Sequence, residues 1–151
     1  MGRMYSGGAS AAVTGANVDL LEINAPADAT VIVHEITISQ SSDTDSEQAR
    51  LSIQRSTGAS GSGGSANTPN PLEVGDPAFG GTCETHNTTR ATTLVMLRSE
   101  GFNWLSGYQY LPTPETRIKI SPSGRLAVNL EGTPVDSLTI EVTYVIEEVG
   151  G

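Results

Sequence analysis

The sequence is poor in cysteine, in positive charge and in long apolar runs. Cys83 is the one cysteine among 151 residues, so no intramolecular disulfide can form and the disulfide-stabilised class of small secreted domains is excluded. Lys and Arg total 8 against 17 Asp and Glu, and the net charge of −9 disfavours partners such as nucleic acid or an anionic membrane. The longest strongly apolar run, Leu94 to Leu97, is too short for a signal peptide or a membrane span.

What is present predicts an all-β protein. A chain of this length forms one domain and can bury about 70% of the surface that its unfolded form exposes. Its apolar residues alternate with a period of two, which is the pattern of strands with one buried face. We expect about eight strands, at residues 18–23, 30–40, 50–54, 92–98, 101–111, 117–120, 126–131 and 137–147. Proline and glycine punctuate these runs at short intervals, as in β-sandwiches and barrels, and eight is the strand number of a jelly roll.

Two strands carry the clearest patterns. Between Ser137 and Glu147, every second residue is apolar. The set consists of Leu138, Ile140, Val142, Tyr144 and Ile146. Residues 30–40 are β-branched and apolar on both parities, with Val31 and Val33 on one face and Ile36 on the other, which predicts a central strand covered on both sides.

The chain divides into an expected N-terminal arm, residues 1–16, and a sandwich domain, residues 17–151. The arm is predicted because its residues are small and Arg3 is its one charged residue. A Gly/Pro/Ser-rich loop insertion at residues 57–82 is too long for an ordinary connection. It is either a flexible excursion or an interaction loop that becomes ordered against a partner.

Catalytic signals are faint, and we expect no enzymatic activity, no cofactor and no metal. No serine lies in a Gly-x-Ser-x-Gly elbow. His34 shares its strand parity with isoleucines and is expected to be a hydrogen-bonded core residue rather than a catalytic one. Cys83, Glu84 and His86 are too few for a tetrahedral zinc site. The acidic run at 43–47 lacks the glycine and the bidentate glutamate of a calcium loop, so a solvated turn is favoured over a weak calcium site.

The aromatic residues are concentrated in one segment. Four of the seven share one parity between Gly101 and Leu111: Phe102, Trp104, Tyr108 and Tyr110. This stripe either faces the core, forms an interface, or offers a platform on which sugar rings stack. Gly107 could introduce a bulge that breaks the stripe.

Several segments together resemble a known family. They are Asp19-Leu20-Leu21-Glu22-Ile23 followed by Ala25-Pro26-Ala27-Asp28-Ala29, Val31-Ile32-Val33-His34-Glu35-Ile36, the Gly/Ser loop with Pro69, Pro71-Leu72-Glu73 and Gly75-Asp76, Ser121-Pro122-Ser123-Gly124-Arg125-Leu126, and Leu138-Thr139-Ile140. The chain resembles, over most of its length, the small all-β virion proteins of tailed bacteriophages, in particular the capsid decoration (cement) proteins with jelly-roll-like sandwiches.

The resemblance implies a structural protein on the outer surface of the capsid, synthesised in the host cytoplasm, with the major capsid protein and further copies of itself as partners. A homo-oligomer is expected, with a trimer favoured. We expect the arm and the loop to supply the contacts, through Arg3, Met4, Tyr5, Asn67, Pro69, Pro71 and Phe79. Two alternatives stay open: a minor head, neck or tail structural protein, and a carbohydrate-binding or host-adhesion module that uses the aromatic stripe.

Overall fold

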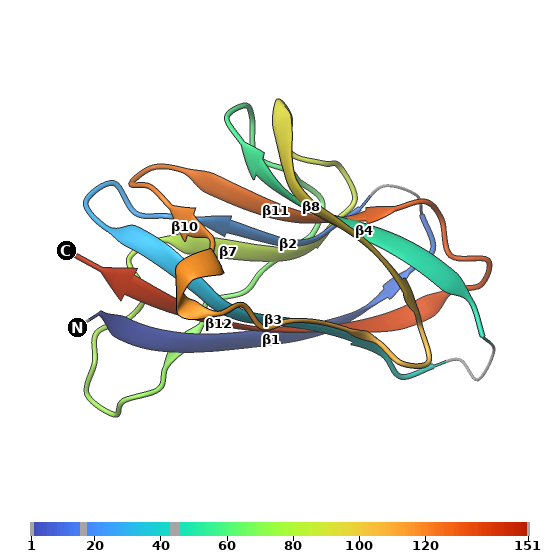
Figure 1. Cartoon of the computed structure of the whole chain (residues 1–151), viewed down its shortest axis with the longest axis horizontal. Helices are drawn as coiled ribbons and strands as arrows, with labels where there is room; N and C mark the ends of the chain where they lie inside the picture. The colour runs from blue at the N-terminus through green and yellow to red at the C-terminus, as the bar shows by residue number, and fades with distance from the viewer. Residues whose placement is uncertain (1, 16–17, 43–45, 151) are drawn as a thin grey trace.

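The computed structural model describes residues 2–15, 18–42 and 46–150, and the chain is an all-β sandwich (Figure 1). Eight of its described strands have six or more residues: β1 (Arg3–Val13), β2 (Asp19–Asn24), β3 (Thr30–Gln40), β4 (Gln48–Ser56), β7 (Thr82–Asn87), β8 (Leu94–Asn103), β11 (Arg125–Glu131) and β12 (Leu138–Val149). The shorter elements are β5 (Ser65–Ala66), β6 (Asn70–Pro71), β9 (Tyr108–Tyr110), β10 (Lys119–Ile120) and the 3₁₀ turn η1 (Pro114–Thr116).

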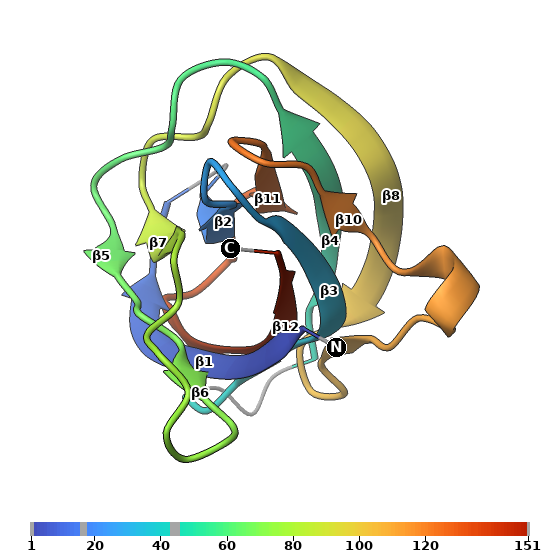
Figure 2. The same ribbon diagram turned by 90° about the vertical axis from the view of Figure 1, so that its left-hand side faces the viewer.

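The strands form two antiparallel sheets that pack face to face. The first sheet has the order β10-β3-β12-β1-β6, with β9 also paired to β3, and the second has the order β5-β7-β2-β11-β4-β8. Figure 2 looks along the strands and shows the two layers enclosing the interior. The expectation of a single antiparallel sandwich is therefore confirmed, while the jelly-roll form stays a prediction.

Strand β12 follows the predicted alternation closely. Its apolar residues at even positions are buried, and the residues between them are half-buried or exposed. These side chains meet those of β2, β4 and β11 across the sandwich, since all belong to one hydrophobic core. The period-two pattern therefore placed the core face of this strand correctly, because one sheet face packs and the other meets solvent.

The expected N-terminal arm is instead a full strand of the first sheet. Residues 3–13 pair along their whole length with β12, and Tyr5 is completely buried. Packing requires a small residue at one position of this strand. A Cβ on Gly7 would lie 2.4 Å from the ring of Tyr144, the residue opposite it in the register. Gly7, one of the small residues that indicated an arm, is thus a packing requirement of a strand, whereas Gly8 and Ser10 are exposed.

A β-bulge explains the two-sided pattern of β3. Val33 pairs with Ile146 while Glu35 pairs with Val145, so His34 is an extra residue in the register. The bulge reverses the parity at this point, and the apolar residues on both sides of it face the same core. They are Val31, Val33, Ile36 and Ile38. The strand is central in its sheet, but it is buried on one face rather than on two.

The segments predicted as strands at 92–98 and 101–111 are divided differently in the structure. Residues 94–103 form the single strand β8, and a turn then leads to β9 in the other sheet. Gly107 lies in this turn with a φ of 69°, which side chains other than glycine rarely adopt. The glycine that could have made a bulge therefore ends the strand and lets the chain cross between sheets.

The long loop at 57–82 also crosses between the sheets. Within it, β5 pairs with β7 of the second sheet, and β6 pairs with β1 of the first. Backbone hydrogen bonds join Ser62 and Thr89 in both directions, at 3.0 Å each. The loop therefore closes one side of the sandwich instead of extending freely from it.

Replacing Tyr5 tests whether β1 is part of the core. We expect Tyr5→Ala to lower the free energy of unfolding by about 3 to 5 kcal/mol, because it removes a large buried ring from the core. On the same strand, the exposed Ser10→Ala serves as the control and should cost less than about 1 kcal/mol. Urea denaturation followed by tryptophan fluorescence measures both. An unfolding curve for Tyr5→Ala that matches the wild type would mean that the segment is an arm after all.

Candidate functional site

The seven residues predicted to contact partners are brought together at one end of the first sheet. The segment 67–81 crosses the start of β1 here and contains four of them, while Arg3, Met4 and Tyr5 lie on β1 itself. Tyr5 stands opposite Pro71 in the β1·β6 register, and its ring packs on Phe79 with the centroids 5.4 Å apart. Three of the seven, Tyr5, Pro69 and Phe79, are buried. These three residues lie beneath the segment and are not part of its outer surface.

Hydrogen bonds hold this segment at both of its ends. Asn67 accepts a bond from the Tyr144 hydroxyl at 2.7 Å and donates one to the Gly8 carbonyl at 2.9 Å. The Tyr5 hydroxyl donates to the Pro77 carbonyl at 3.2 Å, and the amide of Gly80 donates to Glu148 Oε2 at 2.8 Å. Because its two ends are fixed, the middle of the segment is presented in one defined position.

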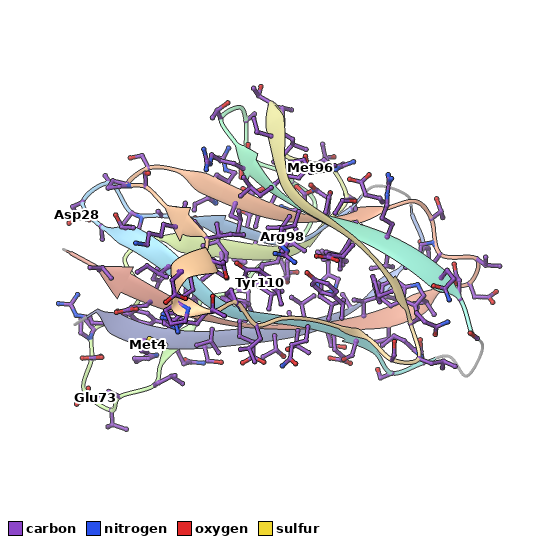
Figure 3. All side chains as sticks on the ribbon, in the orientation of Figure 1. Met4, Asp28, Glu73, Met96, Arg98 and Tyr110 are labelled. Atoms are coloured by element: carbon purple, nitrogen blue, oxygen red, sulfur yellow. The ribbon has the colours of Figure 1, made fainter. Side chains whose placement is uncertain are left out.

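The middle of the segment is a protruding turn, residues 72–76, which we call the acidic turn. Its tip is closed by a bond from the Asp76 amide to the Glu73 carbonyl, at 3.2 Å. Gly75 has a φ of 107° and nothing near the place where a Cβ would stand, so the requirement for glycine is conformational. Leu72 is 59% exposed, and Val74 is fully exposed. The turn thus carries the Glu73 carboxylate and two apolar side chains into solvent, while Asp76 is half-buried (Figure 3).

Leu72 and Val74 were not predicted as contact residues, although the sequence contains a signal for them. The run Leu72-Glu73-Val74-Gly75-Asp76 alternates apolar and acidic residues between two prolines, Pro71 and Pro77. Proline interrupts strand pairing, so a pattern that predicts a strand is not expected to continue past Pro71 or Pro77, and the apolar residues between them have no sheet in which to be buried. The composition of the whole loop hid this short alternation.

A hollow of about 430 Å³ lies between the acidic turn and β1, with Met4, Leu72 and His34 in its wall. His34 Nε2 lies 2.9 Å from Glu147 Oε2, and the Gly2 amide donates to the other oxygen of Glu147 at 3.0 Å. Burial alone would raise the pKa of Glu147, but the bonds from His34 and Gly2 outweigh it and hold that pKa below its usual value. The expectation of a core histidine was wrong. The bulge turns His34 to the outer face, where it is half-buried and contacts Glu147.

The aromatic stripe faces the core. Phe102, Trp104 and Tyr110 are buried, and Tyr108 is half-buried. Phe102 packs edge-on against Trp104 with their centroids 4.8 Å apart, and it also contacts Tyr108. A platform for sugar stacking needs exposed ring faces, and these rings use theirs in the interior. Of the three interpretations left open by the sequence, the core position is the one observed.

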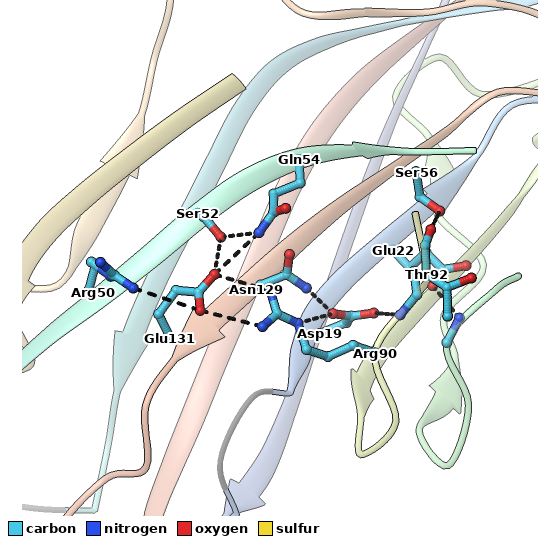
Figure 4. Close-up of polar contacts among 12 residues, drawn as sticks. Asp19, Glu22, Arg50, Ser52, Gln54, Ser56, Arg90, Thr92, Asn129 and Glu131 are labelled. Atoms are coloured by element: carbon cyan, nitrogen blue, oxygen red, sulfur yellow. Dashed lines mark hydrogen bonds and ion pairs between the residues drawn. The ribbon is translucent and has the colours of Figure 1, made fainter. Parts of the chain in front are cut away.

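A second polar cluster lies on the outer face of the second sheet, beneath residues 58–62 and 88–92 (Figure 4). Asp19 is completely buried at its centre. Its Oδ2 accepts a bond from the Ala91 amide at 2.7 Å, its Oδ1 accepts one from the Asn129 amide, and Arg90 Nε lies 3.9 Å away. Arg90 also reaches Glu131, at 3.1 Å. Asp19 therefore fixes the turn at 90–91 to the sheet.

Glu22 is also fully buried, and it fixes the loop at residues 58–62 to the sheet. Its oxygens accept hydrogen bonds from the Ser60 hydroxyl and from the Gly61 amide, the latter at 2.8 Å, and Arg125 Nε lies 3.0 Å away. A Cβ on Gly61 would come within 2.9 Å of Asp19 Oδ2, so glycine is needed for this close approach. The cluster joins two long loops to the sheet, and its carboxylates are engaged with backbone donors and arginines. It therefore has a structural role.

Burial raises the pKa of Asp19 above its ordinary value of 3.8, to about 6. The Ala91 amide opposes this shift, and the neighbouring Glu22 carboxylate adds to it.

The remaining candidates for metal or catalytic chemistry do not assemble a site in the described part of the chain. Among residues 2–15, 18–42 and 46–150, no group of three or more His, Cys, Asp or Glu is placed to hold a metal ion. Burial raises the pKa of the Cys83 thiol to about 12, so it is a neutral core residue. His86 is buried, bonded to the Ile140 carbonyl at 3.0 Å, and burial lowers its pKa. Residues 43–45 of the acidic run lie outside the described residues.

Comparison of the chain with protein-family models, with curated proteins and with solved structures found no match. Within its described residues, the fold contains no helix with the length and apolar character needed to cross a membrane.

Asp19 gives the protein a measurable pH dependence. Because its pKa is raised in the folded state, the folded protein binds a proton more tightly than the unfolded chain does. The contribution of Asp19 to stability is therefore present below about pH 4 and is lost as the pH rises to about 6, a loss of about 2 to 3 kcal/mol. In Asp19→Asn this slope should be absent. Asn129 Oδ1 has no partner and can accept the new amide proton if the Asn129 side chain rotates.

Urea denaturation of the two proteins at a series of pH values between 4 and about 7 measures the difference. Subtracting the two curves removes the contributions of Glu131 and Glu147, whose pKa values are lowered and whose effect has the opposite sign. A difference that does not change with pH would contradict the assignment.

Proposed function

We propose that this chain is a structural virion protein that binds the exterior of a tailed-phage head and stabilises the capsid shell. The resemblance of its turn and strand segments to decoration proteins supports this, and so does the net charge of −9, which suits an outer surface better than a lining that faces DNA. The partner is the major capsid protein, and the protein acts by burying surface rather than by catalysis.

The observation that carries the proposal is the free edge of β8. This strand is the last of the second sheet, and its first half projects with the end of β4 beyond the body of the sandwich (Figure 1). Val95 and Met96 are 53% and 54% exposed. Because neighbouring residues of a strand point to opposite sides, neither face of the sheet is covered here.

An exposed apolar edge strand is a surface that monomeric proteins normally protect with charge, proline or a covering loop. Val95 and Met96 carry no charge themselves, although the exposed Arg55 lies opposite Val95 in the register, so the apolar edge is available for pairing with a strand of another protein or for packing against it. On a head, such a contact stabilises the shell by mass action, since it forms only with the assembled state.

The second sequence-based candidate, a minor head, neck or tail structural protein, would use the same edge and differs only in its partner. The carbohydrate-binding alternative gains no support, because the rings that it would need are in the core.

Co-sedimentation with heads tests the proposal. The protein is incubated with expanded, empty heads of the parent phage, and we expect saturable co-pelleting at a copy number that fits a capsid symmetry class, together with a raised temperature of shell disruption. In Val95→Ser/Met96→Ser we expect binding at least about tenfold weaker, because the apolar contact is lost.

Val135→Ser is the matched control, since this valine is 83% exposed and lies in a turn far along the chain from β8. It should bind heads as the wild type does. Absence of co-pelleting by the wild type would overturn the proposal, and binding to tails or necks instead would favour the second candidate.

A further inference from the structure

The positive charges of this acidic chain are unevenly placed. Five of its eight Lys and Arg residues form ion pairs with carboxylates: Arg3, Arg50, Arg90, Arg98 and Arg125. The other three, Arg55, Arg117 and Lys119, form no such pair with any described residue. With 17 acidic residues in the chain, cations without a carboxylate partner are unexpected.

The three unpaired cations line a single hollow of about 430 Å³, which we call the seam hollow. Arg98 also lines it, but this arginine is neutralised by Glu100 at 2.6 Å. Glu115 is the one carboxylate in its wall, so the seam hollow has a net positive charge. Among the residues that the structure describes, none is a hydrogen-bond partner of the buried Arg117 Nε, which leaves a donor unsatisfied at this position.

The seam hollow lies where the two sheets meet on the side away from the long loop. Arg55 comes from β4 of the second sheet, while Arg117 follows η1 and Lys119 begins β10 of the first sheet. Its wall also has an apolar part, formed by Leu97, Tyr110 and Ile118. Figure 3 shows Arg98 and Tyr110 at this seam, with Met96 above them and Glu73 in the turn that projects below the sandwich.

The seam hollow therefore suits an occupant with both carboxylates and apolar side chains. The acidic turn of the same chain has this chemistry, since it combines the exposed Leu72 and Val74 with the exposed Glu73 and the half-buried Asp76. It is also fixed in position by the bonds at its two ends, so little conformational entropy is lost when it docks.

We propose that the seam hollow binds the acidic turn of a second copy of this chain. Glu73 and Asp76 lie against the cations of the seam hollow, and Leu72 and Val74 pack on its apolar wall. The contact joins two different surfaces, so it is heterologous, and repetition leads to a ring or an open chain of copies. This inference is independent of the proposed function, because it concerns the chain alone and requires no phage head.

Charge reversal on either side of the contact tests it in solution. One variant, Arg55→Glu/Lys119→Glu, has a reversed seam hollow, and the other, Glu73→Lys/Asp76→Lys, has a reversed acidic turn. Sedimentation velocity measures association of each protein alone and of the two mixed. We expect the wild type to self-associate, and more weakly as salt rises from about 0.01 to about 1 M, since the Debye length falls from about 30 to about 3 Å.

Each variant alone should have a dissociation constant at least about tenfold higher than that of the wild type, because like charges then face each other. The equimolar mixture should associate again, since every contact between unlike variants is complementary in charge. Arg50→Glu is the matched control. This arginine is also on β4 and exposed, but it lies outside the seam hollow, so its variant should associate as the wild type does.

Three results would overturn the proposal: a wild-type protein that remains monomeric, variants that associate as the wild type does, or a mixture that stays dissociated. Titration with inorganic phosphate supplies a further check. Phosphate bound by a monomeric wild type and lost in Arg55→Glu/Lys119→Glu would mean that the seam hollow takes a free anion instead. Circular dichroism and urea denaturation confirm that each variant is folded.

Discussion

The pairing of β12 along both of its edges is the constraint on which the rest of the fold depends. Its twelve residues join β1, from the start of the chain, to β3, and its inner face supplies five residues of the core. Because β1 is held in this way, the segment 67–81 can pair with β1 through β6, and Phe79 can pack on the ring of Tyr5. The position of the acidic turn thus follows from a strand pairing whose partners are separated by more than a hundred residues in the sequence.

The fold class could be predicted because strands with one buried face leave a period-two pattern, and β12 shows it from Leu138 to Ile146. The prediction failed where a bulge or a close packing contact changes the pattern locally. The bulge at His34 reverses the parity of β3, so one buried face looked like two. Gly7 must be small because the ring of Tyr144 lies over it, so a central strand resembled an arm. In both cases the deciding contact is with another strand, and a single sequence does not contain that partner's register.

For the candidate contact residues, too, the sequence indicates segments but not which side chains are buried by other strands. The seven candidate contact residues lie in two segments that the structure brings to one end of the first sheet, but the sequence did not separate the buried residues from the exposed ones. Aromatic residues such as Tyr5 and Phe79 are enriched at interfaces and in cores alike, and here they are in the core. The exposed residues are the aliphatic Leu72 and Val74. The seam hollow was beyond prediction, because its three unpaired cations come from segments more than sixty residues apart.

The placement of the acidic turn and the seam hollow limits the assemblies that they can form. In the view along the strands, the segment that follows β6 and the 3₁₀ turn η1 lie on different sides of the molecule (Figure 2). Two copies related by a two-fold axis would have to engage both contacts at once, which requires the two surfaces to face the same neighbour. Surfaces on different sides face different neighbours. Each copy therefore inserts its acidic turn into the seam hollow of one neighbour and binds the acidic turn of another neighbour in its own seam hollow. Such a contact closes into a ring only if the rotation between copies divides a full turn. Because Leu97 and Arg98 of β8 belong to the wall of the seam hollow, a docked acidic turn lies next to Val95 and Met96 on the same strand.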